Sequence, residues 1–291
     1  MKPAPFEYSR PADIDEACAM LAADDGARVI AGGQTLVPLM AMRLARPSRL
    51  IDIARIPGLA YIRDEGKHIA IGATTRQCVV ESDAMVRAKL PLLAKVLPFV
   101  GHTATRARGT VGGSIVNGDS AAESVLVAMT LGATLVWREG GSANPIVAAD
   151  FFLGPMVTAL PLTACLAEAR FPVWSEARVG VGLHEINARQ SDFAFVSAAA
   201  QVALDDDGRC IRAAIGIGAA TAVPLRLDAV ADELKGKRYD EAAVRKSLSA
   251  ALSDIETMAD LHASAAYRKR VAVTMAVRAI ADAYQDAAVR T

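Results

Sequence analysis

Two glycine-rich segments constrain this chain more than any other feature of its sequence. The first spans residues 31–35 and leads directly into a helical stretch, and the second spans residues 108–114. Adjacent glycines allow positive φ and let a ligand approach the backbone closely, and successive N–H groups in such a loop form an anion-binding concavity. Taken singly, either segment is most simply explained as a structural turn. Taken together, the two suit the linked phosphates of a dinucleotide, one loop on each side.

Neither segment matches the common nucleotide-binding motifs. No Gly-Lys-Ser/Thr string follows either one, which excludes a Walker-type phosphate loop. The G-x-G string Gly216-Ile217-Gly218 has no third glycine and ends a predicted strand rather than opening a helix. We therefore expect Gly216 and Gly218 to serve close strand packing and not a Rossmann-type site.

The hydrophobic pattern around the first segment predicts a compact α/β unit of strand, glycine loop, helix and strand. Before it, Asp13 is a helix N-cap candidate with Glu16 three residues later, the spacing of a capping box. The predicted strands are 28–31, 50–53, 61–63, 68–71, 133–138, 165–171, 193–204 and 210–217. The predicted helices are one starting at Asp13 and those at 36–43, 75–99, 123–131, 226–234, 240–256 and 264–287.

Composition limits the class of protein. The 291 residues suffice for two or three domains, and the 53% hydrophobic content is ample for folded cores. The formal net charge is zero, so neither nucleic acid nor an anionic membrane is an expected partner. No apolar run approaches the ~20 residues of a membrane span, and the N-terminal stretch lacks the apolar centre of a secretion signal. We therefore expect a cytoplasmic protein.

The four cysteines, Cys18, Cys78, Cys165 and Cys210, are far apart and form no C-x-x-C pair. This spacing predicts reduced and mostly buried thiols. It does not favour a metal ion or an iron–sulfur cluster held by this chain alone.

The segment 31–40, Ala-Gly-Gly-Gln-Thr-Leu-Val-Pro-Leu-Met, resembles the first FAD loop of the medium subunits of molybdenum hydroxylases. This family includes carbon monoxide dehydrogenase, quinoline 2-oxidoreductase and the flavin domain of xanthine dehydrogenase. The similarity continues through residues 42–53 and 101–123, which include the second glycine segment, and through C-terminal landmarks at 192–194 and 264–268. It covers essentially the whole chain.

The resemblance implies an α+β fold. A two-subdomain FAD-binding unit of the PCMH/VAO type would occupy residues 1–56 and 57–175 and hold FAD between its halves. Residues 176–291 would form a C-terminal α+β domain with a three-stranded antiparallel sheet and a helical bundle. The breaks between the predicted elements agree with these boundaries.

The resemblance also implies a set of FAD-binding positions. Both glycine segments would surround the pyrophosphate, Asp119 would hold a ribityl or ribose group, and Leu160 and Phe193 would lie near the flavin ring. Alternatively, Phe193 is an inward-facing residue of a strand. The candidate positions are Ala31, Gly32, Gly33, Gln34, Thr35, Leu36, His102, Thr110, Gly112, Gly113, Ser114, Asp119, Leu160 and Phe193. We expect no catalytic or metal-binding residue on this chain.

Several polar residues near these positions leave alternatives open. His102 precedes the second segment and would position it. Arg106 and Arg108 would offset diphosphate charge or bind a partner, or else form a solvated basic face. Gln190 stands where the family often has a lysine, and the missing charge would disfavour an anionic reduced flavin.

The function implied by the resemblance is electron transfer. FAD would take electrons from [2Fe-2S] clusters of a small subunit and pass them to an external acceptor, while a large molybdopterin subunit hydroxylates the substrate. A dimer of such heterotrimers is the expected assembly. One rival is a stand-alone FAD-dependent reductase or oxidase, for which the sequence offers no proton donor over the ring. Another is a flavin-free scaffold, against which the intact glycine segments argue.

Overall fold

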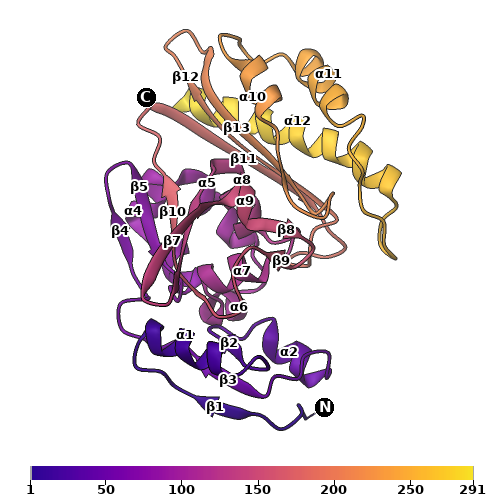
Figure 1. Cartoon of the computed structure of the whole chain (residues 1–291). Coiled ribbons are helices and arrows are strands. Elements are labelled where there is room, and N and C mark those ends of the chain that lie inside the picture. The colour runs from indigo at the N-terminus through magenta and orange to yellow at the C-terminus, as the bar shows by residue number, and fades with distance from the viewer. Residues whose placement is uncertain (1, 291) are drawn as a thin grey trace.

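The structure, a computed structural model, describes residues 2–290 and arranges the chain in three tiers that follow its sequence (Figure 1). The N-terminal tier contains β1 to β3, the middle tier β4 to β10 and the C-terminal tier β11 to β14. Met1 and Thr291, the outermost residues of the first and third predicted domains, lie outside the described residues. Within residues 2–290, none of the helices is both long and apolar enough to cross a membrane.

The N-terminal tier is a three-stranded parallel sheet in the order β1-β3-β2, with two helices. Its elements are β1 (Glu7–Ser9), α1 (Ile14–Ala23), β2 (Arg28–Ile30), α2 (Leu36–Ala41) and β3 (Arg49–Asp52). The Asp13 carboxylate accepts the Glu16 N–H at 2.8 Å, and so caps α1 as predicted. The Glu16 carboxylate in turn accepts the N–H of Ala12 at 2.5 Å, one residue before the position a capping box uses. The predicted α/β unit around the first glycine loop is confirmed.

The middle tier is built on a five-stranded antiparallel sheet in the order β4-β5-β10-β6-β7. The five strands of this sheet are β4 (Ile62–Asp64), β5 (His68–Gly72), β6 (Thr134–Glu139), β7 (Ser142–Val147) and β10 (Cys165–Pro172). The tier also contains a separate two-stranded sheet of β8 (Phe152–Gly154) and β9 (Val157–Thr158). Its helices are α3 (Gln77–Ser82), α4 (Ala84–Lys89), α5 (Pro91–Val96), the 3-10 helix η1 (Leu97–Phe99), α6 (Thr103–Arg108), α7 (Val111–Asn117), α8 (Glu123–Leu131) and α9 (Ala148–Phe151). The largest core of the protein lies between this sheet and these helices, where Ile71, Leu92, Leu126 and Phe171 are fully buried.

The pattern over residues 75–99 predicts one helix, and this prediction is wrong. The segment folds into α3, α4, α5 and η1. Asp83 ends α3 and caps α4 by accepting the Val86 N–H at 3.0 Å. Pro91 begins α5, because proline has no N–H for a helix interior and disfavours a helical conformation at Leu90 before it.

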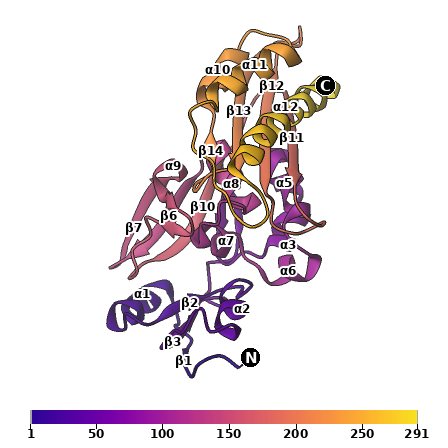
Figure 2. The ribbon, with the colours of Figure 1, turned by 90° about the vertical axis from the view of Figure 1, so that its right-hand side faces the viewer.

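The C-terminal tier is an antiparallel sheet in the order β11-β12-β13-β14, with α12 lying along it (Figure 2). Its elements are β11 (Arg178–Ile186), β12 (Val196–Leu204), β13 (Cys210–Gly218), β14 (Leu225–Arg226), α10 (Asp228–Leu234), α11 (Glu241–Ala251) and α12 (Ala265–Val289). The three-stranded antiparallel sheet implied by the resemblance is confirmed, although the sequence pattern missed β11, and the two-residue β14 extends the sheet at its edge. Ala199 joins the core of the middle tier while its neighbours Ala198 and Ala200 face the C-terminal helices, so this sheet is buried on both faces.

Glycines allow the C-terminal sheet to approach its neighbours closely. A Cβ on Gly182 would fall 1.9 Å from the Ala279 carbonyl oxygen of α12. On β13, a Cβ on Gly216 would fall 2.0 Å from Thr130 Oγ1 of α8, and one on Gly218 would fall 2.6 Å from Ser197 Oγ. The predicted packing role of Gly216 and Gly218 is therefore confirmed.

The strand expected from Phe193 onward begins only at Val196, which corrects the sequence-based start. Ser191 has φ 65°, and the Asp192 carboxylate accepts the Phe193 N–H at 3.0 Å. These features hold residues 187–195 in a loop, so the alternative explanation of Phe193 as an inward-facing strand residue is wrong.

Helix α1 connects the N-terminal tier to the middle tier and thereby helps to place the first glycine loop. Arg138 of β6 forms an ion pair with Asp15 at 3.1 Å, and the Cys18 thiol donates to the Arg138 carbonyl at 3.2 Å. Cys165 lies opposite Arg138 in the sheet and shares a small core with Cys18. All four cysteines are free and three are buried, as predicted.

Candidate functional site

The two glycine segments lie against each other in the folded chain, although they are far apart in sequence. A Cβ placed on Gly32 would fall 2.5 Å from the Arg108 carbonyl oxygen and 2.8 Å from Gly109 Cα. Only glycine permits two backbones to approach this closely. The loops therefore meet where the N-terminal tier faces α6 and α7 of the middle tier (Figure 1).

The first loop presents unused backbone N–H groups. Gly33 turns the chain with φ 70°, and the Gln34 side-chain amide donates back to the Gly32 carbonyl at 3.0 Å. Among residues 2–290, no atom accepts a hydrogen bond from the N–H groups of residues 32–35. Thr35 is exposed, and its hydroxyl does not cap α2, which begins at Leu36. Free N–H groups at this spacing, with a hydroxyl beside them, suit the oxygens of an anion.

The second loop is the first turn of a helix rather than an open loop, which corrects the expectation of two matching amide cradles. Thr110 precedes α7, and its hydroxyl caps the helix by accepting the Gly113 N–H at 3.0 Å. The Ser114 N–H donates to the Thr110 carbonyl at 3.1 Å. These two N–H groups are therefore satisfied within the helix.

The first two N–H groups of α7 are held by the segment that follows β5. Val111 donates to the Thr75 carbonyl and Gly112 to the Ala73 carbonyl, both at 3.0 Å. A Cβ on Gly112 would fall 2.6 Å from the Ala73 Cα. Gly112 is therefore required for packing inside the protein and does not face a ligand.

Gly113 and Ser114 are the parts of the second loop that a ligand can reach. Gly113 is exposed, and a Cβ there would meet only the Thr110 Oγ1 within 4 Å, at 2.8 Å. Ser114 is half-buried and carries a hydroxyl on the same turn of α7. This side of the site thus offers an open backbone surface and a hydroxyl in place of free N–H groups.

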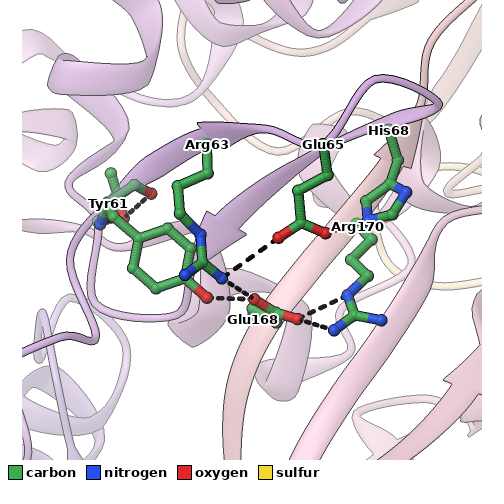
Figure 3. A network of polar contacts seen from close by, with 7 residues as sticks. Tyr61, Arg63, Glu65, His68, Glu168 and Arg170 are labelled. Carbon is green, nitrogen blue, oxygen red and sulfur yellow. Dashed lines mark hydrogen bonds and ion pairs between the residues drawn. The ribbon is translucent and has the colours of Figure 1, made fainter.

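A polar network on the middle sheet is centred on Glu168 (Figure 3). It reaches Thr75, whose carbonyl accepts the Val111 N–H at the start of α7. The buried Glu168 carboxylate on β10 accepts hydrogen bonds from the Tyr61 hydroxyl and from Arg170 Nε, the latter at 2.6 Å. The Thr75 hydroxyl accepts the Tyr61 N–H and donates to the Tyr61 carbonyl, each at 3.0 Å. Burial, followed by the Glu168 hydrogen bond, raises the pKa of Tyr61. The phenol therefore stays protonated near neutral pH and continues to donate to Glu168.

Arg106 is engaged inside the protein, so the expectation that it offsets diphosphate charge is wrong. Its buried guanidinium pairs with Glu81 at 2.7 Å and donates to three carbonyls within residues 98–101. His102 caps α6 through its carbonyl, which accepts the Thr105 N–H at 2.8 Å, while its imidazole is exposed. These contacts shape the turn that leads into the second loop.

Asp119 and Phe193 line one cavity of about 290 Å³ together with residues of the C-terminal tier. Phe193 is 67% exposed, and the Asp119 carboxylate accepts the Ala121 N–H at 2.9 Å. Leu160 is half-buried against the core of the middle tier and is not among the described residues that line this cavity. The structure therefore brings together two of the three residues expected near the flavin and ribityl groups.

Arg268, which also lines this cavity, is a residue to which the sequence assigned no role. It is 3% exposed, donates to the Phe195 carbonyl at 2.6 Å and pairs with Asp260. Hydrogen bonds from the N–H groups of residues 262–263 lower the pKa of Asp260 to about 2, so the pair stays ionised. Arg268 thereby ties the loop that carries Phe193 to α12. The family landmark at 264–268 marked this position without indicating the contact.

Two carboxylates next to this region titrate near neutral pH. Burial raises the pKa of Glu123 and of Glu185 to about 7 each. Glu123 lies in the first turn of α8, and the nearby Glu185 and Asp119 carboxylates raise its pKa further. Glu185 accepts the Asn187 side-chain amide at 2.9 Å, and its other oxygen has no partner within residues 2–290. Sequence reasoning missed both: a glutamate in a first helical turn, such as Glu123, is usually explained by the helix dipole, and Glu185 on β11 belongs to no motif.

Comparison with known proteins decides the family. The family described as "FAD binding domain in molybdopterin dehydrogenase" matches residues 4–174. The chain belongs to this family. A second family, described as "CO dehydrogenase flavoprotein C-terminal domain", matches residues 183–283 of this FAD-binding medium subunit.

The medium subunit is similar to known proteins over nearly its whole length. It is 32% identical to the 6-hydroxypseudooxynicotine dehydrogenase complex subunit alpha of Paenarthrobacter nicotinovorans, over 99% of this chain and 97% of that one. It is 34% identical to the carbon monoxide dehydrogenase medium chain of Hydrogenophaga pseudoflava, over 96% and 97%. The structure of quinoline 2-oxidoreductase from Pseudomonas putida 86 matches with a TM-score of 0.93 and 34% identity over 99% of both chains. The predicted α+β fold and the oxidoreductase class are confirmed.

The residues of this medium subunit fit FAD. The open N–H groups of residues 32–35 and the Thr35 hydroxyl suit phosphate oxygens. The cavity beside Asp119 and Phe193 offers one polar and one aromatic wall to the flavin end of the cofactor.

Proposed function

We propose that this chain is the FAD-carrying electron-transfer subunit of a heterotrimeric molybdenum hydroxylase. FAD lies across the contact between the two glycine loops, with its diphosphate on the first loop and its ring toward the cavity of about 290 Å³. One observation carries the proposal: Gly32 packs against residues 108–109 while the N–H groups of residues 32–35 remain open.

Each part of the proposed site acts on a different part of the cofactor. Residues 31–36 bind the diphosphate through N–H groups and the Thr35 hydroxyl, and Ser114 donates to it from the second loop. Asp119 accepts a hydrogen bond from a ribityl or ribose hydroxyl, and Phe193 covers the flavin ring. Bound FAD supplies a centre that takes electrons singly from an iron–sulfur cluster and releases them singly or in pairs.

The proposed partners are a small subunit with two [2Fe-2S] clusters and a large molybdopterin subunit, in a dimer of heterotrimers. The names of two relatives, a medium chain and a complex subunit, support a multi-subunit assembly. The side chains of Phe193 and Met156 are exposed. The Met156 N–H donates to the carbonyl of Gly118, the residue before Asp119. Exposed apolar side chains beside the cofactor end of the site suit burial against a partner.

The visible absorption spectrum and turnover of the purified chain test this function. We expect flavin absorption from the chain alone without substrate turnover, and turnover once the molybdenum and iron–sulfur subunits are added. Turnover by the isolated chain would favour the stand-alone reductase or oxidase. A chain that stays colourless after soaking in FAD would favour the flavin-free scaffold. Gly154→Ala is a matched control for the loop variants below, because a Cβ there meets nothing closer than 3.9 Å.

A further inference from the structure

We propose that Arg76 is the side-chain cation that binds the FAD diphosphate at the junction of the two glycine loops. The inference rests on the proposed function and adds a residue outside both glycine segments. Arg76 lies in the short stretch between β5 and α3, where it precedes the first residue of α3.

Arg76 is placed at the junction by two contacts to the second loop, one of them to the carbonyl that lies against Gly32. Its backbone forms an isolated antiparallel bridge with Thr110, the residue that caps α7. Its guanidinium Nη1 donates to the Arg108 carbonyl. The oxygen of that carbonyl is the atom that a Cβ on Gly32 would meet at 2.5 Å. A single side chain therefore reaches the point where the first and second loops touch.

The glycine loops offer the diphosphate partial charges only. A diphosphate linking two nucleotide halves carries two negative charges, whereas backbone N–H groups supply only partial positive charge. The N–H groups of residues 111–114 already donate to protein acceptors. Arg106 is neutralised by Glu81. A side-chain cation near the junction would add the full positive charge that the backbone N–H groups lack.

Arg76 is able to supply this charge. Among residues 2–290 it forms no ion pair, and the Arg108 carbonyl occupies only one of its five N–H donors. This contact also holds the guanidinium of Arg76, a half-buried residue, in place before a ligand arrives. Pre-ordering reduces the entropy lost on binding, and the planar fork of arginine matches a phosphate with paired hydrogen bonds.

Arg108 provides a matched control at the same junction. Its carbonyl belongs to the contact, but its side chain is exposed. Arg76→Gln and Arg108→Gln remove the same charge from the same region. They differ in whether the guanidinium is held against the junction, so a local contact can be distinguished from a general loss of positive field.

The test is the affinity of the full-length apo-chain for three ligands, measured by flavin fluorescence and titration calorimetry. We expect Arg76→Gln to weaken FAD and ADP by about 10- to 100-fold, to leave riboflavin unchanged, and to lower the salt dependence of FAD binding. Arg108→Gln should change FAD affinity by less than about 3-fold. Arg76→Lys keeps the charge but not the fork, and should bind FAD with intermediate affinity.

Three results would overturn the assignment: unchanged FAD affinity in Arg76→Gln, equal weakening in both glutamine variants, or equal loss of riboflavin and FAD. If Arg76→Gln does not fold, Arg76→Lys decides: weaker binding of FAD and ADP with unchanged riboflavin affinity supports the contact, and wild-type affinity for FAD and ADP overturns it. A wild-type chain that binds no FAD defeats the proposed function itself. A wild-type chain that binds FAD as tightly as Arg76→Gln does defeats only the role of Arg76.

Discussion

The first and second glycine loops have similar sequences but use their backbones in opposite ways. In the first, the N–H groups of residues 32–35 have no acceptor within residues 2–290. In the second, the N–H groups of residues 111–114 all donate to protein acceptors. Adjacent glycines therefore do not by themselves indicate an anion site. The availability of backbone N–H groups depends on which acceptors the rest of the fold places opposite them.

The glycines of the two loops also differ in what they permit. Gly32 allows one loop to approach the other, Gly33 allows a turn with positive φ, and Gly112 allows α7 to pack on the segment after β5. Only Gly113 faces open space apart from the Thr110 hydroxyl. The comparison thus separates positions needed for folding from positions needed for the ligand, and substitutions can test each one.

The largest effect is expected at Gly112. Gly112→Val places a branched side chain against the Ala73 Cα, which a Cβ alone would already approach to 2.6 Å. Overpacking of this kind costs about 3 kcal/mol or more, so the apo-chain should lose most of its stability. Gly113→Ala is the control and should unfold within a few degrees of wild type in a thermal scan. Equal midpoints for Gly112→Val and wild type would mean that the loop is not packed as described.

The next effect is expected at Gly32. Gly32→Ala forces a Cβ toward the Arg108 carbonyl and so pushes the two loops apart. We expect FAD affinity to fall by about 100-fold, because the diphosphate site depends on the spacing of its parts. Thermal unfolding should change much less than in Gly112→Val, since the N-terminal sheet is not disturbed. Full flavin occupancy in Gly32→Ala would contradict the placement of FAD at this contact.

An intermediate effect on stability is expected at Glu123, in the first turn of α8, the helix that follows the second loop. The pKa of Glu123 is raised to about 7 by burial, whereas its ordinary value is 4.5. Between these values the folded state keeps a proton that the unfolded state releases, so stability is lost as pH rises through this window. Glu123→Gln should therefore be more stable than wild type at pH 8, by about 2 kcal/mol, and similar to it at pH 4.5. Denaturant unfolding at both pH values measures the difference, and a constant gap would contradict the buried titration.

The smallest effects are expected at two threonines, of which one caps a helix and the other is available to the ligand. Thr110 caps α7, so Thr110→Val should cost about 1 kcal/mol of stability. Thr35 caps nothing, so Thr35→Val should leave stability unchanged and weaken FAD by about 10-fold through the lost hydroxyl. Thermal scans and FAD titrations of both variants check the contrast. The predicted contrast would be wrong if Thr35→Val lowered stability while keeping full FAD affinity.

Local patterns were sufficient where an element is encoded within a few residues. The Asp13 cap, the strand–loop–helix unit around residues 28–41 and the hairpin of β12 and β13 all follow from residues that are neighbours in sequence. The prediction of a single helix over 75–99 was wrong because it followed helix propensity and overlooked two local stop signals, Asp83 and Pro91. Family resemblance marked the glycine loops, Asp119 and Phe193 and included Glu123 without a role, whereas Arg76 and Glu185 carried no motif.

The sequence by itself determined where the backbone can bend, which segments form strands and helices, and which family the chain resembles. Only the tertiary structure decided which N–H groups stay open, because the acceptors for α7 come from Ala73 and Thr75 on a different segment. It also decided which arginine has an ion-pair partner within residues 2–290, because Arg106 pairs with Glu81 from α3 while Arg76 forms no ion pair and is placed at the loop junction. Hydrogen bonds and ion pairs depend on distance in space, and spacing in sequence does not specify that distance for segments joined by intervening chain.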